Sequence, residues 1–240
     1  MKTKIILWDV YGTLIASERG DLDSLVRRQD ELLAASEQTV RNFSLSMSGE
    51  ALNEHFIAAI KAERDRRIAE GVAHPEVRIE EIWLKLLDGV TLNQAREVAL
   101  FFERHANPRR LQPHAFDTLM ELKQRGLRQG IISNAQFYTL IELSELLRVE
   151  SECAICTYES IFDSRLVFLS CDLGVAKPDP TAFLRAREIL LRDGIIPERC
   201  LLVGDSLEND IEPARAVGFR AAHFAPDGDV TDLRDVLELL

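Results

Sequence analysis

Apolar residues follow two different patterns along the chain. The first apolar run, residues 5–8, is too short for a helix, and Gly12 follows it closely, which predicts a buried strand that ends at Asp9. Residues 16–107 instead carry apolar residues at helical spacing, with no convincing strand among them. This stretch predicts an inserted all-helical domain, with helices expected at 21–36, 49–71, 79–87 and 92–105.

Strands and helices alternate over the second half of the chain. Such alternation is typical of a parallel, doubly wound α/β sheet. We therefore expect a Rossmann-like core domain made of residues 1–15 and 108–240. Within it, strands are expected at 127–133, 166–170, 200–203 and 219–224, and helices at 113–123, 136–147, 178–194, 208–217 and 232–240.

Composition and charge narrow the possible partners. The chain has 240 residues, of which 46% are hydrophobic and 29% charged, as in ordinary soluble proteins. Its 29 basic and 40 acidic residues give a net charge of −11, which disfavours nucleic acid or an anionic membrane as a partner. No apolar run is long enough for a membrane span and no signal sequence is recognised, so a cytoplasmic protein is expected. The four cysteines lack zinc-ligand spacing and are interpreted as reduced thiols.

Three carboxylates are expected at one edge of the predicted sheet. Asp9 ends the first strand, Asp205 follows the strand at 200–203, and Asp210 comes one helical turn later. The carboxyl ends of parallel strands are where ligands bind in open α/β sheets. Carboxylate oxygens are the ligands that Mg²⁺ prefers, so the sequence predicts a Mg²⁺ site formed by these residues.

Groups that can bind an anion are expected at the same edge. Ser133 and Asn134 lie at the tip of the strand at 127–133, where a hydroxyl and nearby backbone N–H groups can hold an anionic oxygen. Lys177 precedes a helix that opens with proline, which places a cation near the positive end of the helix dipole. Together with the carboxylates, these residues indicate a site that handles a phosphoryl group.

The order of these motifs resembles the haloacid dehalogenase superfamily. The chain has an aspartate after the first strand, then Ser133, then Lys177-Pro-Asp, and finally Gly204-Asp-x-x-x-Asn-Asp210. The resemblance covers the predicted core, 1–15 and 108–240, and the helical insertion at 16–107 is similar to the cap domain that this superfamily places between its first and second motifs. The resemblance implies a hydrolase that acts on a small anionic substrate.

The resemblance also implies a role for each matching residue. Asp9 would be the nucleophile and form a covalent aspartyl intermediate. Ser133, with Asn134 and Thr13, would bind the transferring group, and Lys177 would neutralise both that group and Asp9. The implied Mg²⁺ ligands are the Asp9 side chain, the Tyr11 backbone carbonyl and Asp205, with Asp210 acting through water or behind the direct ligands.

One position departs from the phosphatases of this superfamily. They carry a second aspartate two residues after the nucleophile, which serves as general acid and base, whereas this chain has Tyr11. General acid-base catalysis contributes typically about 10²- to 10⁴-fold. The sequence Asp-x-Tyr-Gly-Thr resembles the L-2-haloacid dehalogenases, whose halide leaving group needs no proton. Those enzymes have a serine in place of Asp205 and use no metal.

Three hypotheses follow. The first is a Mg²⁺-dependent hydrolase of the phosphatase type that acts through Asp9 on a small, phosphorylated metabolite. The second is a metal-independent dehalogenase of 2-haloacids, which Tyr11 favours and Asp205 opposes. The third is a binding or regulatory protein that keeps the fold and metal site but turns over poorly. No oligomeric state is predicted.

Overall fold

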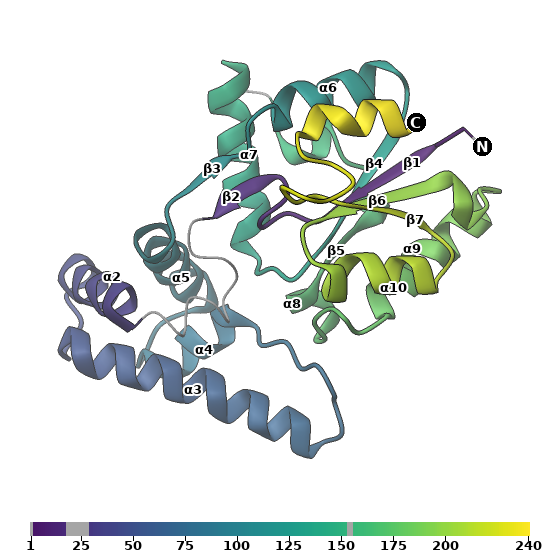
Figure 1. Ribbon diagram of the computed structural model, residues 1–240. Coiled ribbons are helices and arrows are strands. Elements are labelled where there is room, and N and C mark those ends of the chain that lie inside the picture. Colours follow the sequence, from purple (N-terminus) through teal and green to yellow (C-terminus); the bar gives the residue numbers. More distant parts are fainter. Residues whose placement is uncertain (1, 18–28, 153–155) are drawn as a thin grey trace. The chain divides into compact units, whose positions relative to one another are not determined.

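The computed structural model describes residues 2–17, 29–152 and 156–240 and divides into two compact units (Figure 1). Unit 1 comprises Met1–Ala16 and Arg110–Leu240, and unit 2 comprises Ser17–Arg109. Two short strands, β2 (Ile15–Ser17) and β3 (Arg109–Leu111), pair with each other where the chain passes between the units. The part of the predicted first helix at 21–28 lies outside the described residues.

Unit 1 is built on a parallel five-stranded sheet, which confirms the predicted α/β fold. The central strand β1 (Ile5–Trp8) pairs with β4 (Arg128–Ser133) on one side and with β6 (Cys200–Gly204) on the other. The outer strands β5 (Val167–Leu169) and β7 (Arg220–His223) complete the order β5-β4-β1-β6-β7. Because all strands run the same way, their carboxyl ends share one edge.

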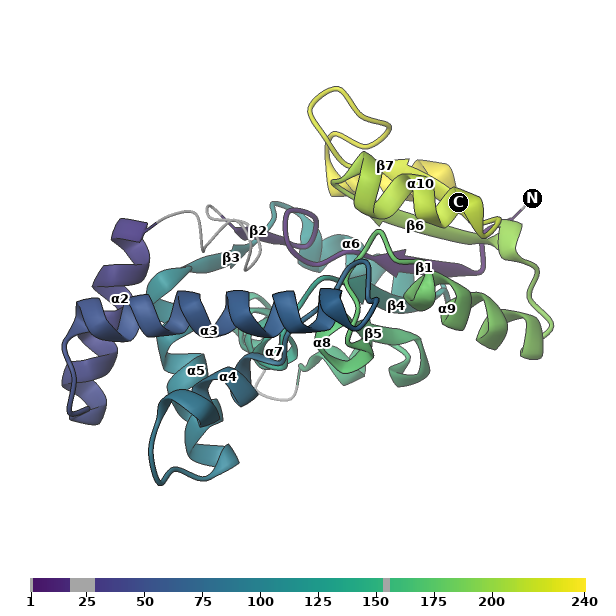
Figure 2. The ribbon, with the colours of Figure 1, turned by 90° about the horizontal axis from the view of Figure 1, so that it is seen from below.

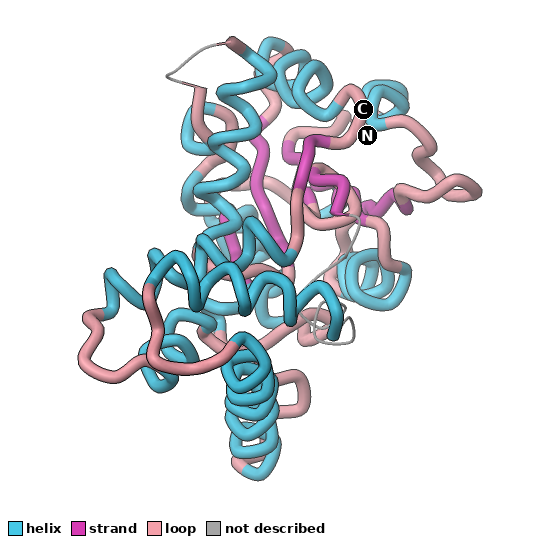
Figure 3. Tube along the Cα trace, turned by 90° about the vertical axis from the view of Figure 1, so that its left-hand side faces the viewer, coloured by secondary structure: helices cyan, strands magenta, loops and turns pink. Residues whose placement is uncertain are grey.

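Helices cover both faces of this sheet, as the tube view shows (Figure 3). Side chains of β1 alternate between the faces, so that Ile6 and Trp8 pack on one side and Ile5 and Leu7 on the other. The first side is covered by α6 (Ala115–Gln124), α7 (Tyr138–Ser151) and a 3₁₀ helix at Leu233–Leu239. The second is covered by α9 (Thr181–Arg192) and α10 (Glu212–Ala216); a short helix, α8 (Ser170–Leu173), follows β5.

Four described helices make up unit 2: α2 (Gln29–Phe43), α3 (Gly49–Ala69), α4 (Ile79–Leu86) and α5 (Leu92–Ala106). The long helix α3 is seen along its length in Figure 2. Rings of Phe56, Trp83 and Phe102 pack together at the centre of the unit, with centroids 4.9–5.1 Å apart. Within the described part of the chain, no helix combines the length and apolar character that a membrane span requires.

Several element boundaries differ from the sequence expectation. The predicted end of the first helix at Ser36 is wrong: α2 continues to Phe43, and the Thr39 hydroxyl donates to the Ala35 carbonyl within it (2.8 Å). The helix expected at 208–217 begins with a π-helical turn, Leu207–Ile211, before α10. The closing helix is 3₁₀ rather than α, and the short strands β2 and β3 were not expected.

A buried glutamine links β1, β4 and α6. The Gln129 side chain accepts a hydrogen bond from Trp8 Nε1 (3.1 Å) and donates to the Leu119 carbonyl (2.9 Å). We expect Gln129→Met to lower the free energy of unfolding by about 1–3 kcal/mol, because the buried Trp8 N–H loses its partner. Urea denaturation followed by circular dichroism measures the loss. The same substitution at exposed Gln124 should change stability by less than about 0.5 kcal/mol, and equal effects would contradict the prediction.

Candidate active site

Asp9 lies at the carboxyl edge of the sheet, directly after the central strand. All four residues of β1 are fully buried, and the Asp9 side chain is almost fully buried with them. The Asp9 backbone N–H donates to the Val203 carbonyl of β6 (2.9 Å), so the residue is still held by the sheet. The strand therefore fixes a carboxylate at the position that the sequence predicted for it.

A buried lysine joins this carboxylate to a second one. Lys177 Nζ lies 2.6 Å from Asp9 Oδ1 and 2.5 Å from Asp210 Oδ1, and it also donates to the Ile132 carbonyl (3.2 Å). The lysine backbone is held in turn, because its N–H donates to Asn134 Oδ1 (2.7 Å) and its carbonyl accepts from Asn134 Nδ2 (3.2 Å). The ammonium group thus points at the two aspartates, and the Asn134 amide fixes the segment that carries it.

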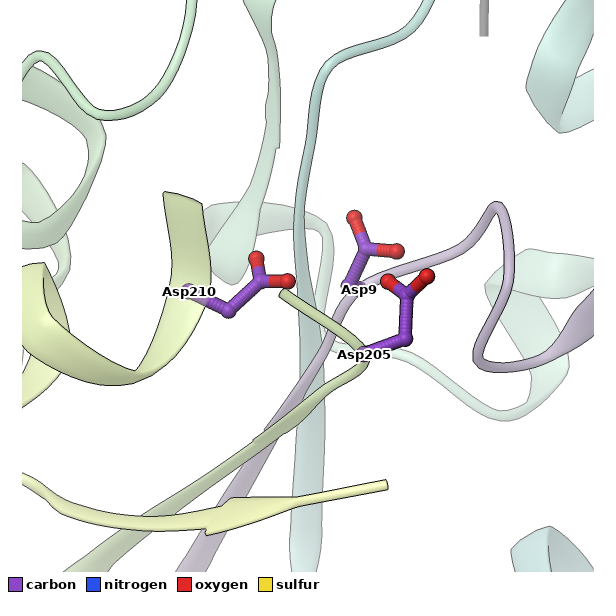
Figure 4. A group of neighbouring side chains, drawn as sticks. All are labelled: Asp9, Asp205 and Asp210. Atoms are coloured by element: carbon purple, nitrogen blue, oxygen red, sulfur yellow. The ribbon is translucent and has the colours of Figure 1, made fainter. Parts of the chain in front are cut away.

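Three carboxylates converge beside this lysine. One oxygen from each of Asp9, Asp205 and Asp210 lies within 4.8 Å of the others. Figure 4 shows the three side chains turned toward a common space, Asp9 from the end of β1 and the other two from the segment after β6. Gly12 makes room for this cluster: with a φ of +89°, it lies where an added Cβ would be 2.1 Å from Asp205 Oδ2. A set of carboxylate oxygens of this kind fits a hard divalent cation.

Burial and mutual repulsion disfavour the ionised forms of two carboxyl groups in this site. Burial raises the pKa of Asp9 to about 7, Lys177 opposes the rise, and the Asp210 and Asp205 carboxylates add to it. Partial desolvation and the Asp210 carboxylate also raise the pKa of Asp205. Burial disfavours the charged form of Lys177, but its pairs with Asp210 and Asp9 outweigh this effect and raise its pKa. Among the described residues, a single ammonium faces three carboxylates, so a bound cation would relieve their repulsion.

Two predicted anion-binding hydroxyls lie buried in unit 1, with no hydrogen-bond partner in the described part of the chain. Ser133 ends β4 and Thr13 follows the Gly12 turn; both side chains are buried. Neither hydroxyl has a hydrogen-bond partner among the described residues. A buried hydroxyl without a partner is unfavourable unless a ligand or water supplies one. These groups are therefore available to an anionic ligand, whereas the Asn134 side chain already contacts the Lys177 backbone.

Tyr11 is held by a residue that no sequence pattern singled out. Its hydroxyl lies 2.6 Å from Oγ1 of Thr139, a fully buried residue in the first turn of α7. The two residues are 128 positions apart, and Thr139 lies inside a helix whose pattern indicates only core packing. His223 was also not selected, and its Nε2 donates to the Asp205 carbonyl (3.0 Å). Its place at the end of a predicted strand was a signal that could have found it.

Comparison with known proteins identifies the family. A sequence model of the haloacid dehalogenase-like hydrolases matches residues 3–218. The chain therefore belongs to the haloacid dehalogenase-like hydrolases, which confirms the resemblance that the motifs indicated.

Curated relatives include several phosphatases. Phosphoserine phosphatase of Thermus thermophilus is 31% identical over 154 residues, which are 60% of this chain and 56% of that protein. The chain thus spans little more than half of that relative's length. Pyrophosphatase PpaX of Oceanobacillus iheyensis is 26% identical, with 100% and 98% of the two chains covered. Phosphoglycolate phosphatase of Shigella boydii is 29% identical, with 89% and 77% covered.

Solved structures share the fold across nearly the whole chain. A 2-haloacid dehalogenase from Pseudomonas syringae pv. Tomato has a TM-score of 0.62 at 20% identity, with 99% of this chain and 97% of that chain covered. A haloacid dehalogenase-type phosphatase from Thermococcus onnurineus has a TM-score of 0.56 at 21% identity, with 100% and 97% covered. The fold is therefore common to dehalogenases and phosphatases, and it does not separate the two activities.

The raised pKa of Asp9 predicts how stability depends on pH in metal-free protein. The folded state keeps the Asp9 proton up to about pH 7, whereas the ordinary value is 3.8, so stability falls as pH rises between these values. Asn cannot ionise, and we therefore expect Asp9→Asn to raise Tm in EDTA. The difference in Tm between the variant and the wild type should widen from pH 5 to about pH 7 and then stay constant. Thermal unfolding at a series of pH values measures it.

Asp193→Asn is the matched control for that experiment. A hydrogen bond from Arg128 lowers the pKa of the Asp193 carboxyl, so its charged form stabilises the folded state. This substitution should lower Tm slightly at neutral pH, the opposite sign to Asp9→Asn. A Tm gap for Asp9→Asn that is absent at pH 8 or independent of pH would contradict the inferred proton affinity of Asp9.

Proposed function

We propose that this protein is a Mg²⁺-dependent phosphatase that hydrolyses a small phosphorylated metabolite through a covalent intermediate on Asp9. The observation that carries the proposal is the junction of Asp9, Lys177 and Asp210, with Asp205 beside them at the edge of the sheet. Members of the family named as phosphatases support this choice, including one matched along almost the full length of both chains. The substrate class and the cytoplasmic location expected from the sequence belong to the same proposal.

Mg²⁺ would be held by oxygen atoms of this cluster. Asp9 and Asp205 side chains and the Tyr11 backbone carbonyl would bind it directly, and Asp210 would act through water or by orienting its neighbours. Bound Mg²⁺ would neutralise carboxylate charge and weaken the repulsion between Asp9 and an anionic phosphoryl group. The raised pKa values of Asp9 and Asp205 support this assignment, because burial and the neighbouring carboxylates disfavour the charged forms of both groups, and a cation would relieve this penalty.

The residues of the chain divide the chemistry among them. A carboxylate oxygen of Asp9 attacks phosphorus, the bond to the leaving-group oxygen breaks, and the leaving group takes the electron pair. Lys177 favours the ionised form of Asp9 and offsets charge on the transferring group. The buried hydroxyls of Ser133 and Thr13 donate to phosphoryl oxygens. Water then attacks the acyl phosphate, which releases inorganic phosphate and regenerates the Asp9 carboxylate. The proton lost by the attacking water passes to solvent.

Tyr11 limits the leaving groups that this site can handle. Its hydroxyl is in hydrogen-bond contact with Thr139, and a phenol is a much weaker acid than the carboxylic acid that it replaces. A leaving group that departs without a proton, such as the carboxylate released from an acyl phosphate, needs no such acid. We therefore infer that activated phosphates are better substrates than alkyl phosphate esters.

Tyr11 also supports a second candidate function, the displacement of halide from 2-haloacids. A halide leaves without protonation, so a tyrosine at this position does not hinder the step. The convergent carboxylates oppose this alternative, because a metal-independent enzyme gains nothing from Asp205 and Asp210 beside its nucleophile. Slow turnover of every substrate class would instead favour a binding or regulatory role.

The first test separates these functions directly. We expect the purified chain to release phosphate from a panel of phosphate esters and acyl phosphates with Mg²⁺ present, and to lose this activity in EDTA. Asp9→Asn should reduce turnover to background, because the nucleophile is gone. Release of halide from 2-chloropropionate that ignores the chelator would overturn the proposal, and no turnover of any substrate would favour the binding role.

The second test measures the role of Tyr11. Across aryl and alkyl phosphates of graded leaving-group acidity, we expect kcat/KM to fall steeply as the leaving group becomes more basic. Tyr11→Asp supplies a carboxylic acid and should raise turnover of alkyl phosphates, by at most about 10²- to 10⁴-fold. Tyr11→Phe is the matched control, since both variants lose the Thr139 contact but only one gains an acid. A shallow dependence in the wild-type protein would contradict this account of Tyr11.

A further inference from the structure

The peptide bond between Asp205 and Ser206 is held from both ends. Its carbonyl, on Asp205, accepts a hydrogen bond from His223 Nε2 (3.0 Å). Its N–H, on Ser206, donates to Asp210 Oδ2 (3.0 Å). This peptide is the first one beyond β6 and carries Asp205, so its orientation sets where that side chain points.

The sheet places His223 beside this peptide. His223 is the last residue of β7 and is aligned with Gly204, the last residue of β6. The last backbone hydrogen bond along this pair runs from the Phe224 N–H to the Gly204 carbonyl (2.8 Å), and the next carbonyl, on Asp205, is the one that the His223 ring reaches. The His223 backbone N–H donates to Asp229 Oδ2 (3.0 Å), which fixes the residue that carries the ring.

The same peptide connects His223 to the ion pairs of the site. Asp210 uses Oδ2 for the Ser206 N–H and Oδ1 for Lys177, so rotation of its carboxylate would disturb both contacts. The π-helical turn allows Asp210 to make both contacts. In this turn the Ser206 carbonyl accepts hydrogen bonds from both the Asp210 N–H (3.0 Å) and the Ile211 N–H (3.2 Å). Close packing leaves little freedom, since a Cβ on Gly204 would lie 2.5 Å from the Asp210 side chain.

We propose that His223 is a positioning residue that orients the Asp205–Ser206 peptide and so places the Asp205 and Asp210 carboxylates for a divalent cation. A carbonyl oxygen only accepts hydrogen bonds, so His223 acts as a donor through Nε2–H. Without this donor the peptide can turn, and the Ser206 N–H no longer meets Asp210 at a fixed angle. The inference rests on the proposed Mg²⁺ site and adds to it a residue from the next strand.

Three substitutions at His223 provide the test. Gln places an amide donor near the position of Nε2, Asn places it near Nδ1, and Leu removes it. We expect Leu and Asn to weaken Mg²⁺ binding to the full-length protein by roughly tenfold or more, as measured by isothermal titration calorimetry, and Gln to restore it close to the wild-type value. Equal affinities for the Leu and Gln variants would overturn the proposal.

Hydrogen exchange provides a readout that requires no metal. In EDTA, amides of residues 205–210 should exchange faster in His223→Leu than in wild type or His223→Gln, while residues 128–133 of β4 should be unaffected. His105→Leu is the control, because it removes a ring-nitrogen contact to the Phe101 carbonyl (2.7 Å) in unit 2. It should change neither readout.

The two measurements separate this inference from the proposed function. If wild-type protein binds no Mg²⁺, the proposed metal dependence is contradicted, and hydrogen exchange alone then decides the role of His223. Unchanged exchange at residues 205–210 in His223→Leu would overturn the positioning role, whether or not Mg²⁺ binds.

Discussion

The candidate site depends on one buried interaction, the placement of the Lys177 ammonium between Asp9 and Asp210. Buried charges are tolerated in proteins when they are paired and hydrogen-bonded, and this lysine satisfies all three of its protons, the third with the Ile132 carbonyl. Its partners come from β1, β4 and the turn after β6, which are neighbours in the sheet order. One side chain therefore links three adjacent strand ends, and the catalytic chemistry that we propose depends on these contacts.

The charges around this lysine do not balance. Three carboxylates share one ammonium, and burial together with mutual repulsion leaves Asp9 with a pKa near neutrality. A purely structural ion pair would be better served by fewer acids, so the surplus negative charge supports the Mg²⁺ site that we propose. The buried hydroxyls of Ser133 and Thr13, which have no hydrogen-bond partner among the residues described, complement this surplus as potential donors to an anion. A cation site beside an anion site is what the phosphoryl transfer that we propose would require.

Sequence reasoning located the strand ends but not the contacts between distant segments. Asp9 and Asp205 were predictable because each directly follows an apolar run, and parallel strands bring such positions to one edge. The contact between Tyr11 and Thr139 was not, since it depends on how α7 packs against the sheet. The π-helical turn was missed for a similar reason: the Ser206 carbonyl accepts two N–H groups, a choice that no local pattern specifies. The strands β2 and β3, which have three residues each and form a separate two-stranded sheet, were also not predicted.

The distribution of aromatic residues has a practical consequence. The chain contains two tryptophans, and the structure places a fully buried one in each unit: Trp8 beside Asp9 in unit 1, and Trp83 in the aromatic centre of unit 2. Trp8 donates to Gln129, while Trp83 packs against phenylalanine rings. The two indoles therefore report on separate hydrophobic cores by intrinsic fluorescence. Replacing either one with phenylalanine leaves a single tryptophan, whose emission can be excited selectively over that of the three tyrosines, so the unfolding of each unit can be followed without an added label.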